Sequence, residues 1–99
     1  MPGTYTGFEW DPRKNARNVR ERGIGFDLAT HVFDDNYFEY REERIEYGED
    51  RHVVIRCVER NGLPLILFVV WTPRFPNRRI ILARIANSDE KEKYRKFRG

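Results

Sequence analysis

Basic side chains gather in two stretches of the sequence, and their chemistry suits the binding of phosphate. Residues 12–26 hold five basic side chains against the single acid Glu21, and residues 74–84 hold four arginines and no acid. A fold that brings the first helix, the last strand and the basic C-terminal tail together creates one positive surface, which is typical of a site for a nucleic-acid backbone. Each stretch taken alone is more typical of ordinary solvated surface charge, and only their convergence in space favours a function.

Other reactive residue types give weaker signals. His31 and His52 are interpreted as partly buried structural residues, because neither stands in a pattern of catalytic groups. Adjacent Asp34 and Asp35 have no third ligand at useful spacing, so no metal site is predicted. The lone Cys57 excludes an internal disulfide and argues against structural zinc. We expect a chain without metal or cofactor.

The composition fits one small domain. The chain has 99 residues, of which 39% are hydrophobic and 35% are charged. Its longest apolar run, residues 65–71, is far shorter than the roughly 20 residues needed to span a bilayer. The first ten residues show no signal-peptide pattern. We therefore expect a single domain over residues 1–99 that acts in the cytoplasm and binds no membrane.

The elements that must position the basic groups begin with a helix. Asp11 as N-cap and Pro12 at the first helical position predict its start, and Gly23 predicts its end. Ala16 and Val19 are its expected aliphatic anchors, so most of its circumference is polar.

Two further helices are predicted. In the first of them, residues 26–33 carry apolar side chains at helical spacing, and residues 34–36 end it. The last helix begins at Ser88 as its cap, and Tyr94 and Phe97 are expected to dock it.

Five strands are predicted between and around these helices, at residues 8–10, 37–40, 52–58, 65–72 and 79–86. Asn61-Gly62 predicts a type I′ hairpin turn, and residues 42–50 suggest a charged hairpin turning at Gly48. The unbroken apolar run 65–72 indicates a central strand, and residues 72–77 read as a proline-bounded loop. The expected fold class is α+β: an antiparallel sheet of four to five strands with two N-terminal helices and a C-terminal helix.

Five ordered motifs closely resemble the BrnT toxin family across nearly the whole chain. They are Phe8-Glu9-Trp10-Asp11-Pro12-x-Lys14, Gly23-Ile24-Gly25-Phe26, Val32-Phe33-Asp34-Asp35, Tyr47-Gly48-Glu49-x-Arg51, and Arg79-Ile80-Ile81-x-Ala83-Arg84-x-Ala86. The resemblance implies a RelE-like fold and an RNA endonuclease activity that is ribosome-independent or ribosome-linked. Two positions depart from the family pattern: Arg22 stands where members often carry His, and Leu82 stands where Ser is common.

Arg79 and Arg84, both within the last motif, are the expected phosphate clamps. RNA cleavage without metal uses the ribose 2′-OH as the nucleophile, so the protein must stabilise negative charge on the phosphate. Guanidinium groups bind phosphate bidentately and stay charged. Because side chains alternate along a strand, these two point to opposite faces unless a bulge lies between them. Without a bulge, one of them is structural or binds a partner, and a salt bridge to the acidic residues 27–51 explains either equally well.

Lys14 and Tyr94 complete the predicted catalytic group. Lys14 lies in the first turn of a helix, where phosphate contact is its easier role. Tyr94 is expected to orient a group or donate a proton, whereas Glu49 is better explained as a hairpin salt bridge than as a base. The predicted substrate-binding residues are Arg13, Arg17 and Arg51.

The leading functional hypothesis is a toxin of a type II toxin-antitoxin system that cleaves RNA without metal and so inhibits translation. The resemblance implies neutralisation by a BrnA-like ribbon-helix-helix antitoxin, a heterotetramer, and contact with operator DNA through that antitoxin. The alternatives are a non-catalytic co-repressor or antitoxin-binding module in promoter autoregulation, and a sequence-tolerant RNA-binding module.

Overall fold

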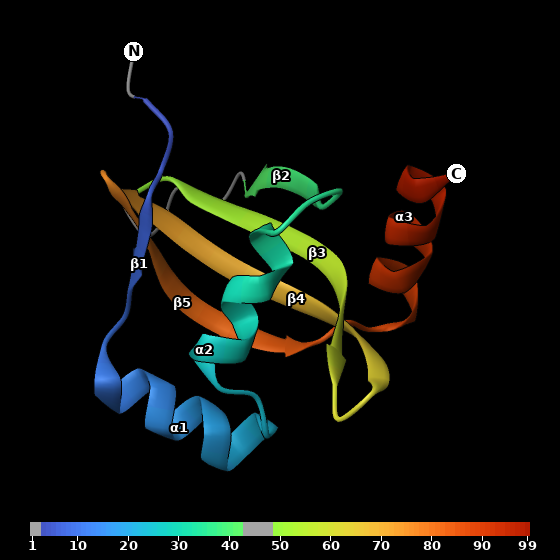
Figure 1. Ribbon diagram of the computed structural model, residues 1–99, viewed down its shortest axis with the longest axis horizontal. Helices are drawn as coiled ribbons and strands as arrows, with labels where there is room; N and C mark the ends of the chain where they lie inside the picture. Colours follow the sequence, from blue (N-terminus) through green and yellow to red (C-terminus); the bar gives the residue numbers. More distant parts are fainter. Residues whose placement is uncertain (1–2, 43–48) are drawn as a thin grey trace.

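The computed structural model describes residues 3–42 and 49–99 and shows one five-stranded sheet with its helices packed around it (Figure 1). In chain order the elements are β1 (Gly7–Glu9), α1 (Pro12–Arg22), α2 (Phe26–Ala29), the 3-10 helix η1 (Thr30–Phe33), β2 (Phe38–Glu42), β3 (Arg51–Arg60), β4 (Leu63–Arg74), β5 (Asn77–Ile85) and α3 (Ser88–Arg98). The predicted α+β class and order of elements are confirmed.

The sheet is mixed, with the strand order β1-β5-β4-β3-β2. β4 lies at its centre, as predicted, and three of the four strand pairs are antiparallel. The prediction of a wholly antiparallel sheet is wrong at one edge, where β1 runs parallel to β5. No tight turn joins these two strands, so nothing local dictates their relative direction.

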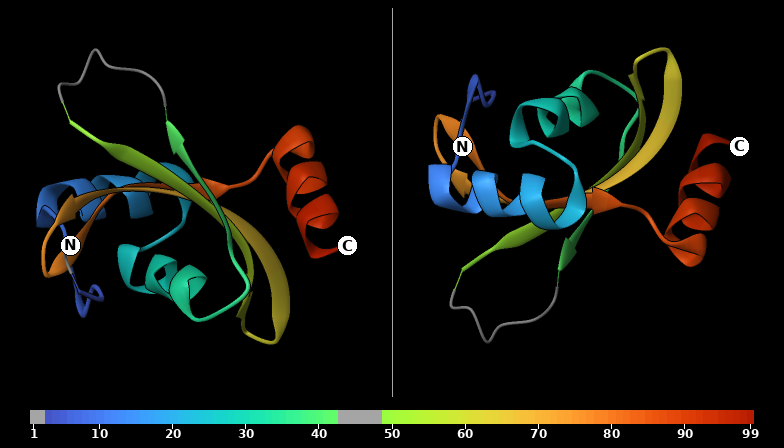
Figure 2. Two further views of the ribbon diagram at one scale, coloured as in Figure 1. Left: turned by 90° about the horizontal axis from the view of Figure 1, so that it is seen from above. Right: turned by 90° about the horizontal axis from the view of Figure 1, so that it is seen from below.

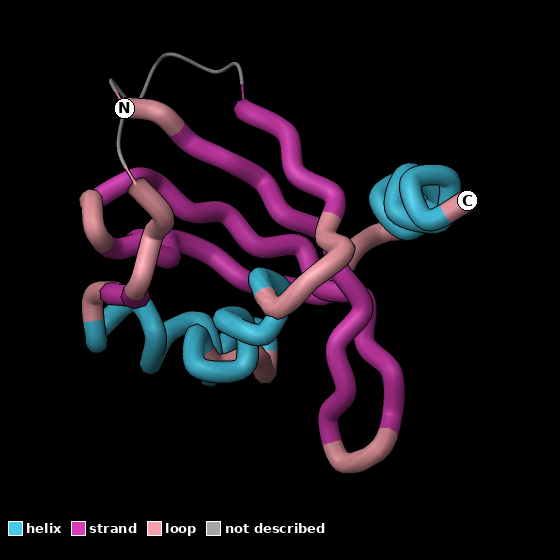
Figure 3. Tube along the Cα trace, turned by 45° about the horizontal axis from the view of Figure 1, so that its top comes forward, coloured by secondary structure: helices cyan, strands magenta, loops and turns pink. Residues whose placement is uncertain are grey.

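The β3–β4 hairpin is the longest in the fold, and its tip extends beyond the rest of the sheet (Figure 3). Asn61 and Gly62 form its turn with φ of 54° and 77°. Both values are positive, which confirms the predicted type I′ geometry.

Two apolar clusters cover opposite faces of the sheet, and we name the faces after the helices that pack on them. On the α2 face, Phe26 and Val32 pack against sheet residues that include Val54 and Val69. On the α3 face, Tyr94 packs with a second cluster that includes Val53. Figures 1 and 2 show α2 lying against the strands and α3 standing beside the sheet, away from α1 and α2. Within residues 3–42 and 49–99, no helix therefore covers much of the α3 face next to α1.

Polar contacts, not aliphatic ones, hold α1 in place. The predicted anchors Ala16 and Val19 are exposed, Val19 to 48%. Asn18 is buried instead, and its Nδ2 donates to the carbonyls of Ile24 and Ala83 at 2.7 Å each. The N–H of Ala83 donates back to Asn18 Oδ1 at 3.4 Å. The side-chain amide thus pairs with β5 like a neighbouring strand where β1 has already ended.

Several predicted boundaries need correction. Residues 26–33 form a short α-helix followed by a 3-10 turn, and the predicted loop 72–77 shortens to the turn Phe75-Pro76, whose peptide bond is cis. Asn87, not Ser88, caps α3: its side chain accepts from the N–H of Glu90, and Glu90 bonds back to the N–H of Asn87. Most of the predicted hairpin 42–50, with Gly48, lies outside the described residues.

Candidate active site

Local signals in the sequence fix the helix that carries the N-terminal cations. The Asp11 carboxylate accepts from the N–H of Arg13 at 2.8 Å, Pro12 opens α1, and Gly23 ends it in the left-handed conformation with φ of 73°. The hydrogen bond from Asn18 to the carbonyl of Ala83 holds the helix against β5, so one side of α1 lies along this strand. Lys14, Arg17, Asn18 and Glu21 share that face because they follow helical spacing.

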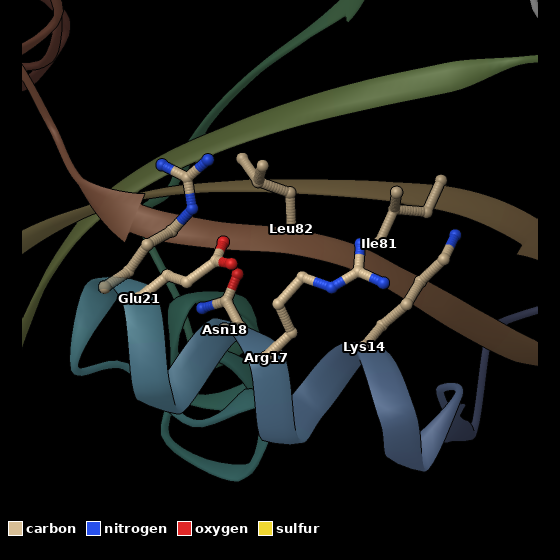
Figure 4. Close-up of a pocket in the computed structure, with 7 residues that line it drawn as sticks. Lys14, Arg17, Asn18, Glu21, Ile81 and Leu82 are labelled. Atoms are coloured by element: carbon tan, nitrogen blue, oxygen red, sulfur yellow. The ribbon is translucent and has the colours of Figure 1, made fainter.

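A cleft of about 190 Å³ runs between α1 and β5, and we call it the α1 cleft. Its lining residues are Lys14, Arg17, Asn18, Glu21, Arg22, Ile81 and Leu82. Figure 4 shows the side chains of Lys14, Arg17 and Glu21 rising from α1 toward Ile81 and Leu82 on β5. Neither Lys14 nor Arg17 forms an ion pair with another of the described residues. Their positive charges are available to an anion in the cleft.

A second pocket, of about 260 Å³, opens on the α3 face, and we call it the sheet pocket. Its floor is apolar, formed by Phe68, Val70, Ile81 and Leu82, and its polar lining residues are Glu42, Arg51 and Arg84. Ile81 and Leu82 line the α1 cleft as well. The two hollows therefore adjoin along these two residues, and together they form what we call the junction site.

A bulge in β5 creates this arrangement. Between Val70 and Trp71 of β4 the paired residue jumps from Leu82 to Ile80, which leaves Ile81 without a direct partner. The extra residue reverses the alternation of side chains along the strand. Arg84, opposite Phe68, and Arg79, opposite Thr72, consequently lie on the same face of the sheet. Of the two alternatives left open by the sequence, the bulge is the one that occurs.

Arg84 lies at the edge of the sheet pocket, where Glu90 and Phe68 contact it. Its two terminal nitrogens donate to the two carboxylate oxygens of Glu90 at 2.8 Å each, and its guanidinium lies 3.9 Å from the centre of the Phe68 ring. The bonds to Glu90 raise the pKa of Arg84, so it stays charged. Its Nε–H forms no hydrogen bond within the described part of the chain. That N–H and the neighbouring Nη2 hydrogen form a second fork that suits phosphate or a base edge.

The remaining predicted residues have other contacts. Arg79 donates to Glu9 Oε2 at 2.7 Å and lines neither hollow of the junction site. Hydrogen bonds from Asn77 and Arg79 lower the pKa of Glu9, so this pair remains ionised. Arg13 is exposed in the first turn of α1 and also lies outside both hollows.

Tyr94 is buried in the apolar cluster beneath α3, with only 3% of its surface exposed. Its hydroxyl accepts from Arg98 at 3.3 Å, and it lines neither hollow of the junction site. The structure thus brings Lys14, Arg17, Arg51 and Arg84 together and leaves Arg13, Arg79 and Tyr94 outside the group. The salt bridges of Arg79 and Arg84 go to Glu9 and Glu90, and neither arginine pairs with a described acid among residues 27–42 and 49–51.

The sequence interpretation missed two carboxylates, Glu21 in the α1 cleft and Glu42 in the sheet pocket. Glu21 was detectable, since it stands four residues after Arg17 and seven after Lys14 on one helical face. Glu42 could not be detected from the sequence, because its position near Arg84 depends on how the strands pair. Glu49 pairs with Arg51 and Arg74, which supports its structural interpretation.

The histidines lie away from the junction site. His52 is half-buried and stacks on Trp71 at 4.7 Å between ring centres, as expected of a structural residue. His31 is exposed and lies 3.4 Å from Asp34, so its predicted partial burial is wrong. Among the residues described, no cluster of His, Cys, Asp or Glu has the arrangement of a metal site. None of their helices is long and apolar enough to cross a membrane.

The model of one protein family matches residues 10–90, most of the chain. That family is described as the ribonuclease toxin BrnT of type II toxin-antitoxin systems. The chain belongs to this family. The toxin is also similar to the crystal structure of the Brucella abortus ribonuclease toxin BrnT, with 27% sequence identity and a TM-score of 0.63. That match covers 84% of this chain and the whole of the Brucella chain. No curated protein sequence is significantly similar to the toxin.

Family membership makes the toxin a ribonuclease toxin of a type II system, with an antitoxin protein as its partner. The match begins at Trp10, just ahead of α1, and ends at Glu90 in α3. All the residues of the junction site fall inside it. The segment that carries Tyr94 falls outside it.

Proposed function

We propose that the toxin is a metal-independent endoribonuclease and that the junction site is where it cleaves RNA. The observation that carries this proposal is the pair of cations without ion-pair partners, Lys14 and Arg17, beside the same apolar wall that borders Arg51 and Arg84. The junction site has five cations, Lys14, Arg17 and Arg22 in the α1 cleft and Arg51 and Arg84 in the sheet pocket. This arrangement suits a chain of phosphates better than a neutral small molecule.

In the proposed reaction the ribose 2′-oxygen attacks the adjacent phosphorus while the bond from phosphorus to the 5′-oxygen breaks. The products are a 2′,3′-cyclic phosphate and a 5′-hydroxyl. Lys14 and Arg17 bind the non-bridging oxygens and stabilise the added charge. Glu21, the carboxylate in the α1 cleft, accepts the 2′ proton, and the Lys14 ammonium donates a proton to the departing oxygen. This scheme needs no histidine, and in this chain Arg22 occupies the family's usual histidine position.

Arg79 and Tyr94 enter the proposal as supporting residues. Arg79 secures β1 against β5 through Glu9, and Tyr94 secures α3, whose Glu90 holds Arg84. Arg13 adds positive charge at the α1 N-terminus. Their replacement is expected to lower activity less than replacement of Lys14 or Arg17.

The test is cleavage of a defined single-stranded RNA by purified toxin, free of antitoxin, in excess EDTA. Parallel reactions contain or lack ribosomes, and the ends of the products are analysed. We expect cleavage with 2′,3′-cyclic phosphate ends in at least one of the two reactions. Cleavage that depends on added divalent metal, or no cleavage with or without ribosomes, overturns the proposal.

We further propose that the antitoxin is a BrnA-like ribbon-helix-helix protein, that two toxin and two antitoxin chains form a heterotetramer in the cytoplasm, and that the complex contacts operator DNA through the antitoxin. Family membership and the type II system support this proposal. Co-purification of the toxin with the protein encoded beside it, followed by light scattering, measures the stoichiometry. A heterodimer of one toxin chain and one antitoxin chain in solution contradicts the heterotetramer.

A further inference from the structure

We propose that the sheet pocket receives the nucleobase next to the cleaved phosphate, so that the toxin selects its RNA targets by base. This inference rests on the proposed function, in which the α1 cleft binds the phosphate. It adds a specificity pocket formed by Phe68, Val70, Ile81 and Leu82 below Glu42, Arg51 and Arg84.

The floor of the pocket is suited to a flat aromatic ligand. Its four floor residues are apolar, and three of them are only partly buried, so part of that surface meets solvent. α3 packs farther along the same face, around Ala86 and Tyr94, and supplies no lining residue. The Arg84 guanidinium, whose central carbon lies 3.9 Å from the centre of the Phe68 ring, adds a planar group on which a base can stack. Bases splayed from single-stranded RNA stack on aromatic rings and on arginine planes.

The position of the pocket ties it to the phosphate. Ile81 and Leu82 form part of its floor and also part of the wall of the α1 cleft. One nucleotide carries a base and a phosphate on the same ribose, and two adjoining hollows of different character match those two groups. The sheet pocket, with its apolar floor, fits the base, and the α1 cleft, with Lys14 and Arg17, fits the phosphate.

The polar lining of the pocket can distinguish one base from another. Arg84 offers the Nε–Nη2 fork as a donor pair, and the Glu42 carboxylate accepts hydrogen bonds. Adenine, cytosine and guanine carry an exocyclic amino group that donates to a carboxylate, whereas uracil carries none. We therefore expect the pocket to favour amino-bearing bases over uracil.

A peptide segment of the antitoxin is a different class of occupant for this apolar floor. The observations favour RNA because the cations in the adjoining cleft lack acidic partners, and a nucleotide supplies the anion and the flat apolar group in a single unit. The test below can distinguish binding of an antitoxin peptide from binding of RNA.

The test is equilibrium binding of the four nucleoside 3′-monophosphates and of inorganic phosphate to the full-length toxin, by calorimetry and by amide chemical shifts. We expect the best nucleotide to bind at least about tenfold more tightly than phosphate and about tenfold more tightly than the uridine nucleotide. Shifts are expected at Phe68 and Leu82 with nucleotides but not with phosphate. Glu42→Ala should reduce the preference over uridine to within about threefold without changing the affinity for phosphate.

Glu92→Ala, at an exposed acid on α3, is the matched control and should preserve the preference. Equal affinity for phosphate and all four nucleotides overturns the inference, as does a preference that Glu42→Ala leaves intact. Shifts at Phe68 and Leu82 that appear only with the antitoxin assign the pocket to protein binding and also overturn it. Nucleotide binding can be measured without cleavage. If the toxin shows the base preference but does not cleave RNA in EDTA, the base-binding pocket is supported and the proposed nuclease mechanism is contradicted.

Discussion

Asn18 is the residue that aims the cations of α1. Its amide occupies the free edge of β5 at Ala83 and also bonds to the carbonyl of Ile24, where the chain leaves the helix. The helix itself was predictable, because Asp11, Pro12 and Gly23 act on their immediate neighbours. Its anchoring was not, since Asn18 and Ala83 are 65 residues apart and an asparagine in a polar helix has no periodic signal.

Asn18→Ala is expected to lower the free energy of unfolding by about 2–3 kcal/mol, because buried backbone groups of Ile24 and Ala83 lose their hydrogen-bond partner. Urea denaturation measures the change. Val19→Ala, at the exposed neighbouring position, should stay within about 0.5 kcal/mol of the wild type. An Asn18→Ala protein as stable as the Val19→Ala protein shows that α1 is held by other contacts.

At the scale of elements, the bulge at Ile81 and the start of α3 together place Arg84. The alternation of side chains along a strand can be predicted from sequence. A bulge that contains no glycine has no local sequence signal, so the bulge in β5 could be predicted only as one of two alternatives. The capping box of α3 was partly readable from its acidic first turn. The second bond of Glu90, to Arg84, depends on how α3 returns to the sheet, and the sequence carries no signal for it.

This link makes part of the stability depend on pH. Burial of the Glu90 side chain raises its pKa, but hydrogen bonds from Arg84 and from the N–H of Asn87 outweigh burial, so the pKa lies below its usual value of 4.5. A carboxyl group with a lowered pKa stabilises the fold above its unfolded pKa, and that contribution disappears as the pH falls through the folded pKa.

Glu90→Gln is therefore expected to cost about 1 kcal/mol at pH 7, because a neutral amide bonds Arg84 less strongly. The difference from wild type should shrink as the pH falls below about 4. Urea denaturation at pH 7 and pH 3 measures it, with Glu92→Gln on the exposed side of α3 as the control. A difference that is the same at both pH values contradicts the assigned role of Glu90.

At the scale of the whole molecule, two of the three basic segments meet. α1 lies beside β5, whereas α3 stands away from α1 (Figure 1). Composition could show that the positive charge is segregated along the chain, but only the strand order and the Asn18 contact decide which segments converge. All three arginines of β5 have an acidic or aromatic partner, and Arg74 at the end of β4 pairs with Glu49. The charge left for a ligand therefore comes chiefly from α1.

RNA affinity should consequently depend on salt through α1. Binding of a non-cleavable single-stranded RNA, measured from low to moderate salt, gives the slope of log K against log salt. Removing two phosphate contacts with Lys14→Ala/Arg17→Ala should reduce the magnitude of this slope by about 1.4. The matched pair Arg95→Ala/Lys96→Ala, exposed on α3, should leave it nearly unchanged. If both double variants reduce the slope equally, RNA affinity depends only on the net charge of the toxin and not on α1.

Whether RNA is cleaved at the α1 cleft is tested by kcat/KM for one defined RNA in EDTA. The three folded proteins compared are the wild type, Lys14→Ala/Arg17→Ala and Arg95→Ala/Lys96→Ala. If the α1 cleft holds the reacting phosphate, kcat/KM of Lys14→Ala/Arg17→Ala falls at least about 100-fold, and kcat/KM of the α3 variant stays near the wild-type value. An α1 variant that is folded and cleaves within about threefold of wild type contradicts the account.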